Sequence, residues 1–248
     1  MKMKNLLLAA VGFAGFALAG SAFAQCGTGL SNLSAWTGYT QSQGTLAVSP
    51  GGLDTSACKL DSALNAGANA LASATVNFVD SQDEPSYRAQ FLLNADAITG
   101  LGGFDGAQIF SANVNLAPAI QNPNTQLVKL AIVGAGAGKN LTIIAACNNG
   151  SSNKCSTSTP LASGVNRIEI QVSVGGGNPG TGFVNVWVNN TVEGSPTKSI
   201  TAIDNSLWIG MRKAILGLAA PTKAYGNGTH IASFDSFDSR RQTFIGGP

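Results

Sequence analysis

The sequence predicts an all-β protein, built as a two-sheet antiparallel β-sandwich. Between Val165 and Asn190, two runs of alternating apolar and polar residues flank a turn rich in Gly and Pro, which is typical of an antiparallel hairpin. Each strand of that hairpin has an aliphatic face to bury, and a lone hairpin is only marginally stable, so further strands and a second layer are expected. No segment joins a capping residue to a long apolar stripe of helical period, so helix is expected to be minor.

Further strands are expected at short intervals, separated by clusters of Gly, Pro, Asn and Asp. Before the hairpin the candidates are Thr45–Val48, Ala70–Val79, Ser86–Leu93, Ala107–Val114, Gln126–Val133 and Leu141–Ala146. After it they are Lys198–Ile203, Leu207–Arg212 and His230–Phe237. The stretch nearest to a helix, residues 61–71, is weakened by two Asn and a Gly. About ten to twelve strands in one domain need two packed sheets or a closed barrel, and the scatter of strand lengths favours a sandwich.

Residues 1–24 are predicted to be a secretory signal peptide. Lys2 and Lys4 precede an uncharged apolar run that ends in small residues, and cleavage is expected between Ala24 and Gln25. The alternative is a membrane anchor, for which the apolar run is short. No later apolar run is long enough for a membrane span, so we expect a secreted protein without membrane insertion, in which residues 25–248 form a single domain.

The charge balance argues against a nucleic-acid partner. The chain has 14 Lys and Arg against 12 Asp and Glu, and Lys2 and Lys4 lie in the predicted leader, so the mature protein is formally neutral. Its longest basic run is Arg240-Arg241. A nucleic-acid binder needs a basic patch or stripe to neutralise phosphates, which this composition does not provide.

The four cysteines all follow the predicted leader, and an even number in an exported protein indicates disulfides. Cys147 and Cys155 bracket a short polar loop that could join two strand ends, which leaves Cys26 and Cys58 to tie down the N-terminal segment. Of the three pairings that four cysteines allow, we predict Cys26–Cys58 and Cys147–Cys155. Zinc is not expected, because the chain has no CxxC pair and one His.

Four segments carry a resemblance to a known family. They are Ala72–Phe91, Arg167–Val174, Val184–Asn190 and Phe234–Thr243. Together they resemble secreted bacterial proteins of the concanavalin-A-like, laminin-G-like jelly-roll class. The resemblance implies two antiparallel sheets, one of them curved, with the last strand returning beside the N-terminal strands. Members of this class bind sugars or proteins, sometimes with calcium, and some cleave polysaccharides, so the fold does not select a function.

The sequence gives little support for a known hydrolase site. Polysaccharide-cleaving members with this fold carry a Glu-x-Asp-x-x-Glu strand, which none of Glu84, Glu169 and Glu193 begins. A pair of carboxylates from distant strands, such as Glu169 with an Asp, stays open, as does a solvated surface position for Glu169. His230 is the one histidine and no GxSxG motif is present, so a serine hydrolase is not expected. The glycines of residues 134–139 are expected to form a hairpin turn and not a phosphate loop.

Calcium is the one cofactor that the sequence suggests. Asp80, Asp83 and Glu84 place three carboxylates in five residues, between two expected strands. Hard oxygen ligands clustered in a loop suit calcium, although the spacing is not that of a known calcium loop and acidic turns are ordinary at a surface.

The hairpin offers the best indication of a ligand site. Its face opposite the valines is expected to carry an aromatic platform fringed by hydrogen-bonding groups, consisting of Arg167, Glu169, Gln171, Phe183, Asn185 and Trp187. A Trp ring beside amides could stack on a sugar ring. The alternative is that Trp187 and Phe183 fill the core while the valines meet other elements.

These observations lead to a ranked prediction of function. First is a secreted, non-catalytic module that binds a carbohydrate or an extracellular surface protein, because known catalytic patterns are missing. Second is a polysaccharide-active glycoside hydrolase or lyase with carboxylates in a sheet groove. Third is a structural adhesin or matrix protein.

Overall fold

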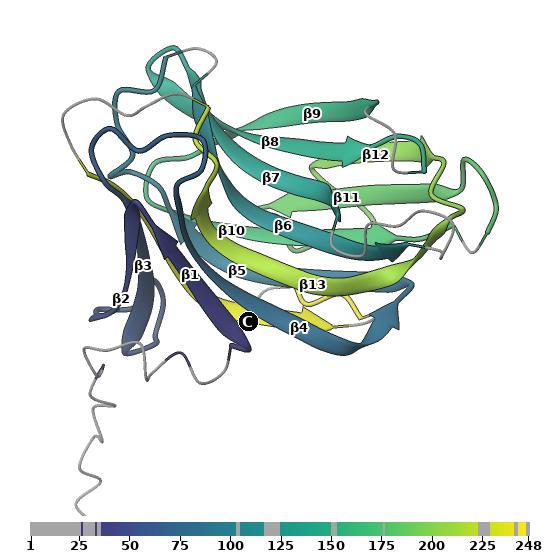
Figure 1. Ribbon diagram of the computed structural model, residues 1–248, viewed down its shortest axis with the longest axis horizontal. Helices are drawn as coiled ribbons and strands as arrows, with labels where there is room; N and C mark the ends of the chain where they lie inside the picture. The colour runs from purple at the N-terminus through teal and green to yellow at the C-terminus, as the bar shows by residue number, and fades with distance from the viewer. Residues whose placement is uncertain are drawn as a thin grey trace, which may run out of the picture.

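The protein is a sandwich of two seven-stranded antiparallel sheets, as predicted (Figure 1). We refer to them as sheet A and sheet B. The computed structural model describes residues 26, 33, 36–102, 105–116, 125–149, 153–175, 177–222, 229–240 and 243–246. The predicted signal peptide, residues 1–24, lies outside this part of the chain.

Sheet A faces the viewer in Figure 1. Its spatial order mixes strands from distant parts of the chain, because β13 lies between β4 and β6. The strands, in spatial order, are β1 (Gly38–Ser42), β4 (Ser73–Glu84), β13 (Trp208–Ala219), β6 (Gly106–Leu116), β7 (Thr125–Ala135), β8 (Gly138–Ala146) and β9 (Lys154–Leu161).

Sheet B contains the hairpin that the sequence shows most clearly. The strands, in spatial order, are β12 (Lys198–Ile203), β11 (Gly182–Val188), β10 (Val165–Ser173), β5 (Ser86–Asn94), β14 (His230–Arg240), β3 (Cys58–Leu64) and β2 (Gly44–Pro50). The last strand, β14, lies between β5 and β3, so the C-terminal strand returns beside an N-terminal one, as the jelly-roll resemblance implies.

The core lies between the sheets and consists of their inward-facing aliphatic and aromatic side chains. Phe91 of sheet B stacks on Phe110 of sheet A with ring centroids 5.7 Å apart, and both rings are fully buried. The hairpin valines and isoleucines face this core, since Ile170 pairs with Val186 and both are fully buried. This orientation places the intervening polar residues on the outer face of sheet B.

One buried polar side chain joins the two sheets. Ser62 of β3 is fully buried, and its hydroxyl donates to the carbonyl of Ala74 in β4 at 2.6 Å. The same hydroxyl accepts from the amide of Leu218 in β13 at 2.8 Å. It therefore satisfies two backbone groups at a place where Gly217 has a φ of 122° and the neighbouring ladder is irregular.

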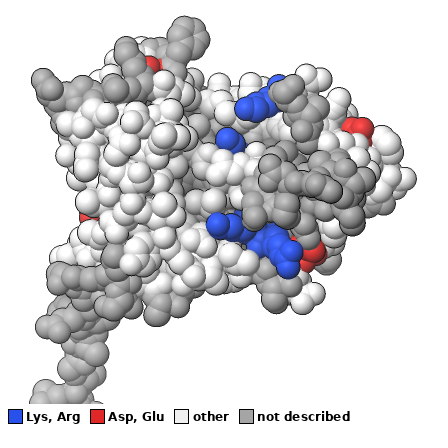
Figure 2. All heavy atoms as spheres, viewed as in Figure 1, with Lys and Arg blue, Asp and Glu red and all other residues white. Residues whose placement is uncertain are grey.

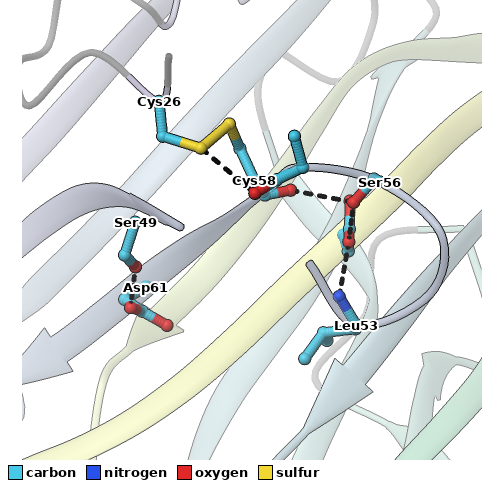
Figure 3. Close-up of a disulfide and its surroundings, with 8 residues drawn as sticks. Cys26, Ser49, Leu53, Ser56, Cys58 and Asp61 are labelled. Atoms are coloured by element: carbon cyan, nitrogen blue, oxygen red, sulfur yellow. Dashed lines mark hydrogen bonds between the residues drawn. A yellow bond between two sulfur atoms is a disulfide. The ribbon is translucent and has the colours of Figure 1, made fainter. Parts of the chain in front are cut away.

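Both predicted disulfides are present. Cys26 is bonded to Cys58 at the start of β3, and Cys147 to Cys155 between β8 and β9. Figure 3 shows Cys58 beside the loop that carries Leu53 and Ser56, so the first disulfide ties Cys26 to β3, the strand next to the edge strand β2 of sheet B.

Three strands were not expected from the sequence, namely β1, β3 and β9. The β3 strand takes the first residues of the segment that came nearest to a helix. The β9 strand has no alternation of apolar residues, because it consists largely of Ser and Thr. It lies at the edge of sheet A, a position that also accommodates Pro160.

Candidate functional site

Sheet A carries an unusual separation of charge. Strands β1, β6, β7, β8, β9 and β13 contain no Asp or Glu, and the acidic residues of β4 are confined to its last five positions. The basic residues of these strands are Lys129, Lys139, Lys154, Arg212 and Lys213. Figure 2 views the molecule from this side: the Lys and Arg atoms form separate groups above and below its middle, acidic atoms adjoin the lower group, and the other acidic atoms lie toward the periphery.

Strand register gathers polar side chains on the outer face of sheet A. Lys129 of β7 pairs with Ser111 of β6, which pairs with Ile215 of β13, which pairs with Asn77 of β4. Directly paired residues point to the same side of a sheet. Their sequence neighbours Phe110, Leu130 and Leu216 are buried in the core, so this row lies on the side of sheet A away from the core, although Ser111 itself is 0% exposed.

A second row lies alongside the first. Lys213 of β13 pairs with Asn113 of β6, and Asn113 pairs with Gln126 of β7. Register shifts lie between Met211 and Lys213 and between Ala112 and Asn113, so both bulges lie beside this row. Bulges change the direction of side chains and are frequent next to active sites. Arg212 lies within the bulge between Met211 and Lys213, and its side chain is exposed.

The environment of this face alters the chemistry of Lys129. Burial, and then the positive charge of Lys154, hold the pKa of the Lys129 ammonium below its usual value. Beside it Ser111 is fully buried, and its hydroxyl has no hydrogen-bond partner within the described part of the chain. A buried hydroxyl without a partner is costly and is a candidate contact for a ligand.

We refer to Lys129, Ser111, Asn113 and Lys213 as the sheet A site. It combines two amines, an amide and a hydroxyl from three adjacent strands. Cationic and amide groups without a carboxylate suit an anionic ligand. The strands that form the site have no Asp or Glu, so they cannot supply the carboxylate pair of a glycoside hydrolase.

The predicted platform on the hairpin has the expected face but not the expected exposure. Glu169 pairs with Trp187 and Gln171 with Asn185, so these side chains lie together on the outer face of sheet B. Trp187 and Glu169 are each only 2% exposed. The expectation of an open ring face at Trp187 is therefore wrong for this conformation.

The cover of this platform comes from residues that were not singled out in the sequence. The ring of Phe244 lies 5.3 Å from that of Trp187, and Arg88 of β5 forms ion pairs with Glu169 and Glu193. The expected platform residues Arg167 and Phe183 are half-buried on the same sheet. No local sequence signal links Phe244 to Trp187, which is far from it along the chain.

The predicted calcium ligands lie in a strand and not in a loop, because β4 continues to Glu84. Glu84 is 4% exposed and pairs with Met211, whose side chain is in the core. The side chain of Asp80 lies outside the described part, and within that part no group of three or more His, Cys, Asp and Glu could hold a metal ion. Calcium binding at Asp80, Asp83 and Glu84 stays a prediction.

Two other sequence motifs have structural roles. Gly136 and Ala137 form the turn between β7 and β8, as expected for a hairpin. His230 begins β14 in sheet B, where its Nδ1 accepts from the amide of Thr99 at 3.4 Å. Burial lowers the pKa of His230. This histidine belongs to sheet B and is therefore not part of the sheet A site.

A cleft of about 480 Å³ opens between the sheets, with mostly apolar walls that include Trp36 and Phe237. Its charged groups are already paired. Asp235 accepts from the Leu53 amide and the Ser56 hydroxyl, and Asp238 pairs with Arg240. The cleft therefore offers less polar chemistry than the sheet A site.

Comparison with solved structures finds the same fold in proteins that act on polysaccharides. The chain is similar to an endo-beta-1,4-glucuronan lyase from the fungus Trichoderma reesei, with a TM-score of 0.62 and 11% identity over 85% of this chain and 92% of that one. It is also similar to the alginate lyase vAL-1 from a Chlorella virus, with a TM-score of 0.59 and 12% identity over 87% of this chain and 98% of that one.

A third similar structure, the cellulose-induced protein Cip1, has a TM-score of 0.56 and 11% identity over 84% of this chain and 90% of that one. At such low identity these similarities show the jelly-roll sandwich and nothing finer. No protein-family profile and no curated protein sequence matches the chain. Within its described residues the chain has no helix long and apolar enough to cross a membrane.

Proposed function

We propose that this protein is a secreted polysaccharide lyase that acts on a polymer of uronic acids at the sheet A site. The observation that carries the proposal is the face formed by Lys129, Ser111, Asn113 and Lys213 on strands that lack any acidic residue. The lyase names of the similar structures support this alternative over a non-catalytic module. The two disulfides support an oxidising compartment outside the cytoplasm.

Elimination from a uronate requires chemistry that this face can supply. A base removes the proton on the carbon next to the carboxyl group, a carbon–carbon double bond forms, and the glycosidic C–O bond at the β position breaks. The departing oxygen takes a proton from water. A group that neutralises the uronate carboxylate makes the first proton easier to remove, so cations and amides take the place of the carboxylate pair of a hydrolase.

We assign the base to Lys129. Burial and the charge of Lys154 favour its neutral amine, and a base works best when its pKa lies near the operating pH. We assign Lys213 and Asn113 to the uronate carboxylate, since they are paired across β13 and β6. The Ser111 hydroxyl is in the same row as Lys129, two positions from Asn113 on β6, and would bind a sugar hydroxyl.

A panel of polysaccharides tests the proposal. We expect the protein to release products with the ultraviolet absorbance of an unsaturated uronate from polyglucuronate or alginate, and none from neutral glucomannan. Lys129→Met should reduce that rate by about 10²-fold or more, the usual contribution of a general base. Lys139→Met is the matched control, because Lys139 is on the same sheet but on the side of β8 that carries the core residue Leu141.

The same assay separates the alternatives. New reducing ends without ultraviolet absorbance would indicate a glycoside hydrolase and contradict the assigned chemistry. Retardation of a polyuronate in gels without product formation would instead support the non-catalytic carbohydrate-binding module. Neither binding nor product formation with any polyuronate would contradict an anionic-polysaccharide function altogether.

A further inference from the structure

The outer face of sheet B contains a buried cluster of aromatic and charged groups, on the side of the sandwich opposite the sheet A site. The guanidinium of Arg88 lies 5.2 Å from the Trp187 ring and 5.3 Å from the Phe244 ring. It also lies 3.3 Å from Glu169 and 2.7 Å from Glu193. Arg88 is only 4% exposed although it lies on an outer sheet face, so other residues must shield this cluster from solvent.

The cover is the C-terminal strap, which we define as residues 243–246. The backbone amides of Ile245 and Gly246 donate to the two carboxylate oxygens of Glu169, each at 3.0 Å. Phe244 places its ring against Trp187. The strap thus presents a ring and two adjacent hydrogen-bond donors to the face, and its own residues are half-buried or exposed.

The strap leaves part of the hydrogen-bonding capacity of this face unused. Arg88 Nε and Gln90 Oε1 are buried, and neither has a hydrogen-bond partner in the described part of the chain. Both residues belong to β5 and, two positions apart, point to the same side of the sheet. One is a donor and the other an acceptor, so a single hydroxyl group placed between them could satisfy both.

We propose that this face is a second carbohydrate site, for a neutral sugar, and that the C-terminal strap occupies it in the free protein. A vicinal diol offers Glu169 two O–H donors in place of the two amides of the strap. The ring face of the sugar takes the place of the Phe244 ring on Trp187. A further hydroxyl accepts from Arg88 Nε and donates to Gln90 Oε1.

The charge and the neighbouring side chains define the ligand class. Arg88 faces two carboxylates, Glu169 and Glu193, so these three ion-paired groups have one negative charge in excess, and the carboxylate of a uronate placed beside Glu169 would be repelled. Gln171 pairs with Arg88 on one side and with Asn185 on the other, so these residues form a row that runs from Arg88 toward the β12 edge of the sheet. Asn185 accepts a hydrogen bond from the Ser199 hydroxyl at 2.7 Å. These amides could contact the next residue of a chain of neutral sugars. The site would thus hold a polymer that the sheet A site does not cleave.

Opening of the strap in the full-length protein tests the proposal. Phe244→Ala removes the ring, and Ile245→Pro independently removes one of the two amide donors. We expect both variants to increase acrylamide quenching of Trp187, measured as the difference from the same variants carrying Trp187→Phe. We also expect at least tenfold tighter retention in affinity gels that contain glucomannan, xylan or mixed-linkage β-glucan.

Two controls make the result specific. Thr243→Ala changes an exposed side chain of the strap and should behave as wild type. Gln90→Leu in the Phe244→Ala protein should abolish the gained retention, because it removes the acceptor that the strap leaves unsatisfied.

Three results would overturn the proposal. The first is an accessible Trp187 with no gain in retention by any neutral polysaccharide, which would make the strap a packing element only. The second is unchanged quenching in both variants. The third is loss of folding in both, because the strap would then be indispensable and not removable. Polyuronate elimination is measured separately, so failure of the proposed lyase activity is distinguishable from failure here.

Discussion

Trp187 is enclosed by groups from three parts of the chain. Its ring contacts Phe244 and Arg88, and its Nε1–H donates to the carbonyls of Val192 and Glu193 at 3.1 and 3.2 Å. Trp187→Ala should therefore lower the free energy of unfolding by about 3 to 5 kcal/mol, as truncation of a buried aromatic does. Urea denaturation measures the loss. A change below about 1 kcal/mol would contradict the enclosed position.

His230 is expected to make stability depend on pH. Burial lowers its pKa, so the unfolded chain takes up the proton more readily than the folded protein. Stability should be lost as the pH falls below about 6.5, the ordinary pKa of histidine, toward the lower pKa of the folded protein. Protonation of Nδ1 would also remove its hydrogen bond from the Thr99 amide.

Denaturant titrations at two pH values check this expectation. Between about pH 7.5 and about pH 5.5, wild-type protein should lose more unfolding free energy than His230→Gln, which cannot titrate in this range. Equal losses in the two proteins would show that His230 titrates alike in the folded and unfolded states.

At the residue scale, the sequence determines the orientation of side chains better than their exposure. The alternation around Ile170 and Val186 correctly predicts which side chains face the core, because strand geometry has a period of two. It could not predict that Phe244 covers Trp187, since that contact depends on the path of the chain after β14. The orphan polar atoms of Arg88 and Gln90 follow from the same long-range packing.

Among the elements, β3 is linked to sheet A through the hydroxyl of Ser62. Ser62→Ala would leave the Ala74 carbonyl and the Leu218 amide without this partner in the core. A buried polar group left unsatisfied costs about 1 to 3 kcal/mol, so the melting temperature should fall by several degrees. Ser199→Ala, on an exposed side chain of β12, is the control and should change stability little. No difference between the two variants would rule out the linking role of Ser62.

The two disulfides should contribute unequally to stability. Cys26 and Cys58 are 32 residues apart and Cys147 and Cys155 are 8 apart, so the first constrains the unfolded chain more. Loop entropy gives about 3.5 to 4 kcal/mol for the first disulfide and about 2.5 to 3 kcal/mol for the second. Denaturation of the two Cys-to-Ser double variants measures both values, and a larger loss at Cys147–Cys155 would contradict the ordering.

Strands with a buried apolar face could be predicted from the sequence, whereas the polar edge strand β9 and the end of β4 could not. The long strands β6, β7 and β10 alternate clearly and were expected close to their observed bounds. The β9 strand is at an edge and consists largely of Ser and Thr, so it has no such pattern. Similarly β4 runs on through the acidic residues 80–84, where a loop was expected.

At the scale of the whole molecule, strand order creates the sheet A site. Lys213 lies in β13, late in the chain, and meets Asn113 only because β13 inserts between β4 and β6. Sequence periodicity contains no information on that insertion. One signal was nevertheless present, since no Asp or Glu occurs from Gly106 to Leu161 while Lys129, Lys139 and Lys154 do.

The pH dependence of elimination tests the assignment of Lys129 most directly. The neighbouring strand β6 has no charged residue, and Lys139 of β8 lies on the other side of that strand from Ile144, which pairs with Lys129, so Lys154 of β9 is the charge that acts on Lys129. Elimination from a polyuronate should rise as the pH increases through the pKa of Lys129, because only the neutral amine accepts the proton. Lys154→Met removes one cause of the lowered pKa, so we predict that this rise moves to higher pH while Lys129→Met abolishes it. An unmoved rise in Lys154→Met, or elimination at the wild-type rate in Lys129→Met, would contradict the account.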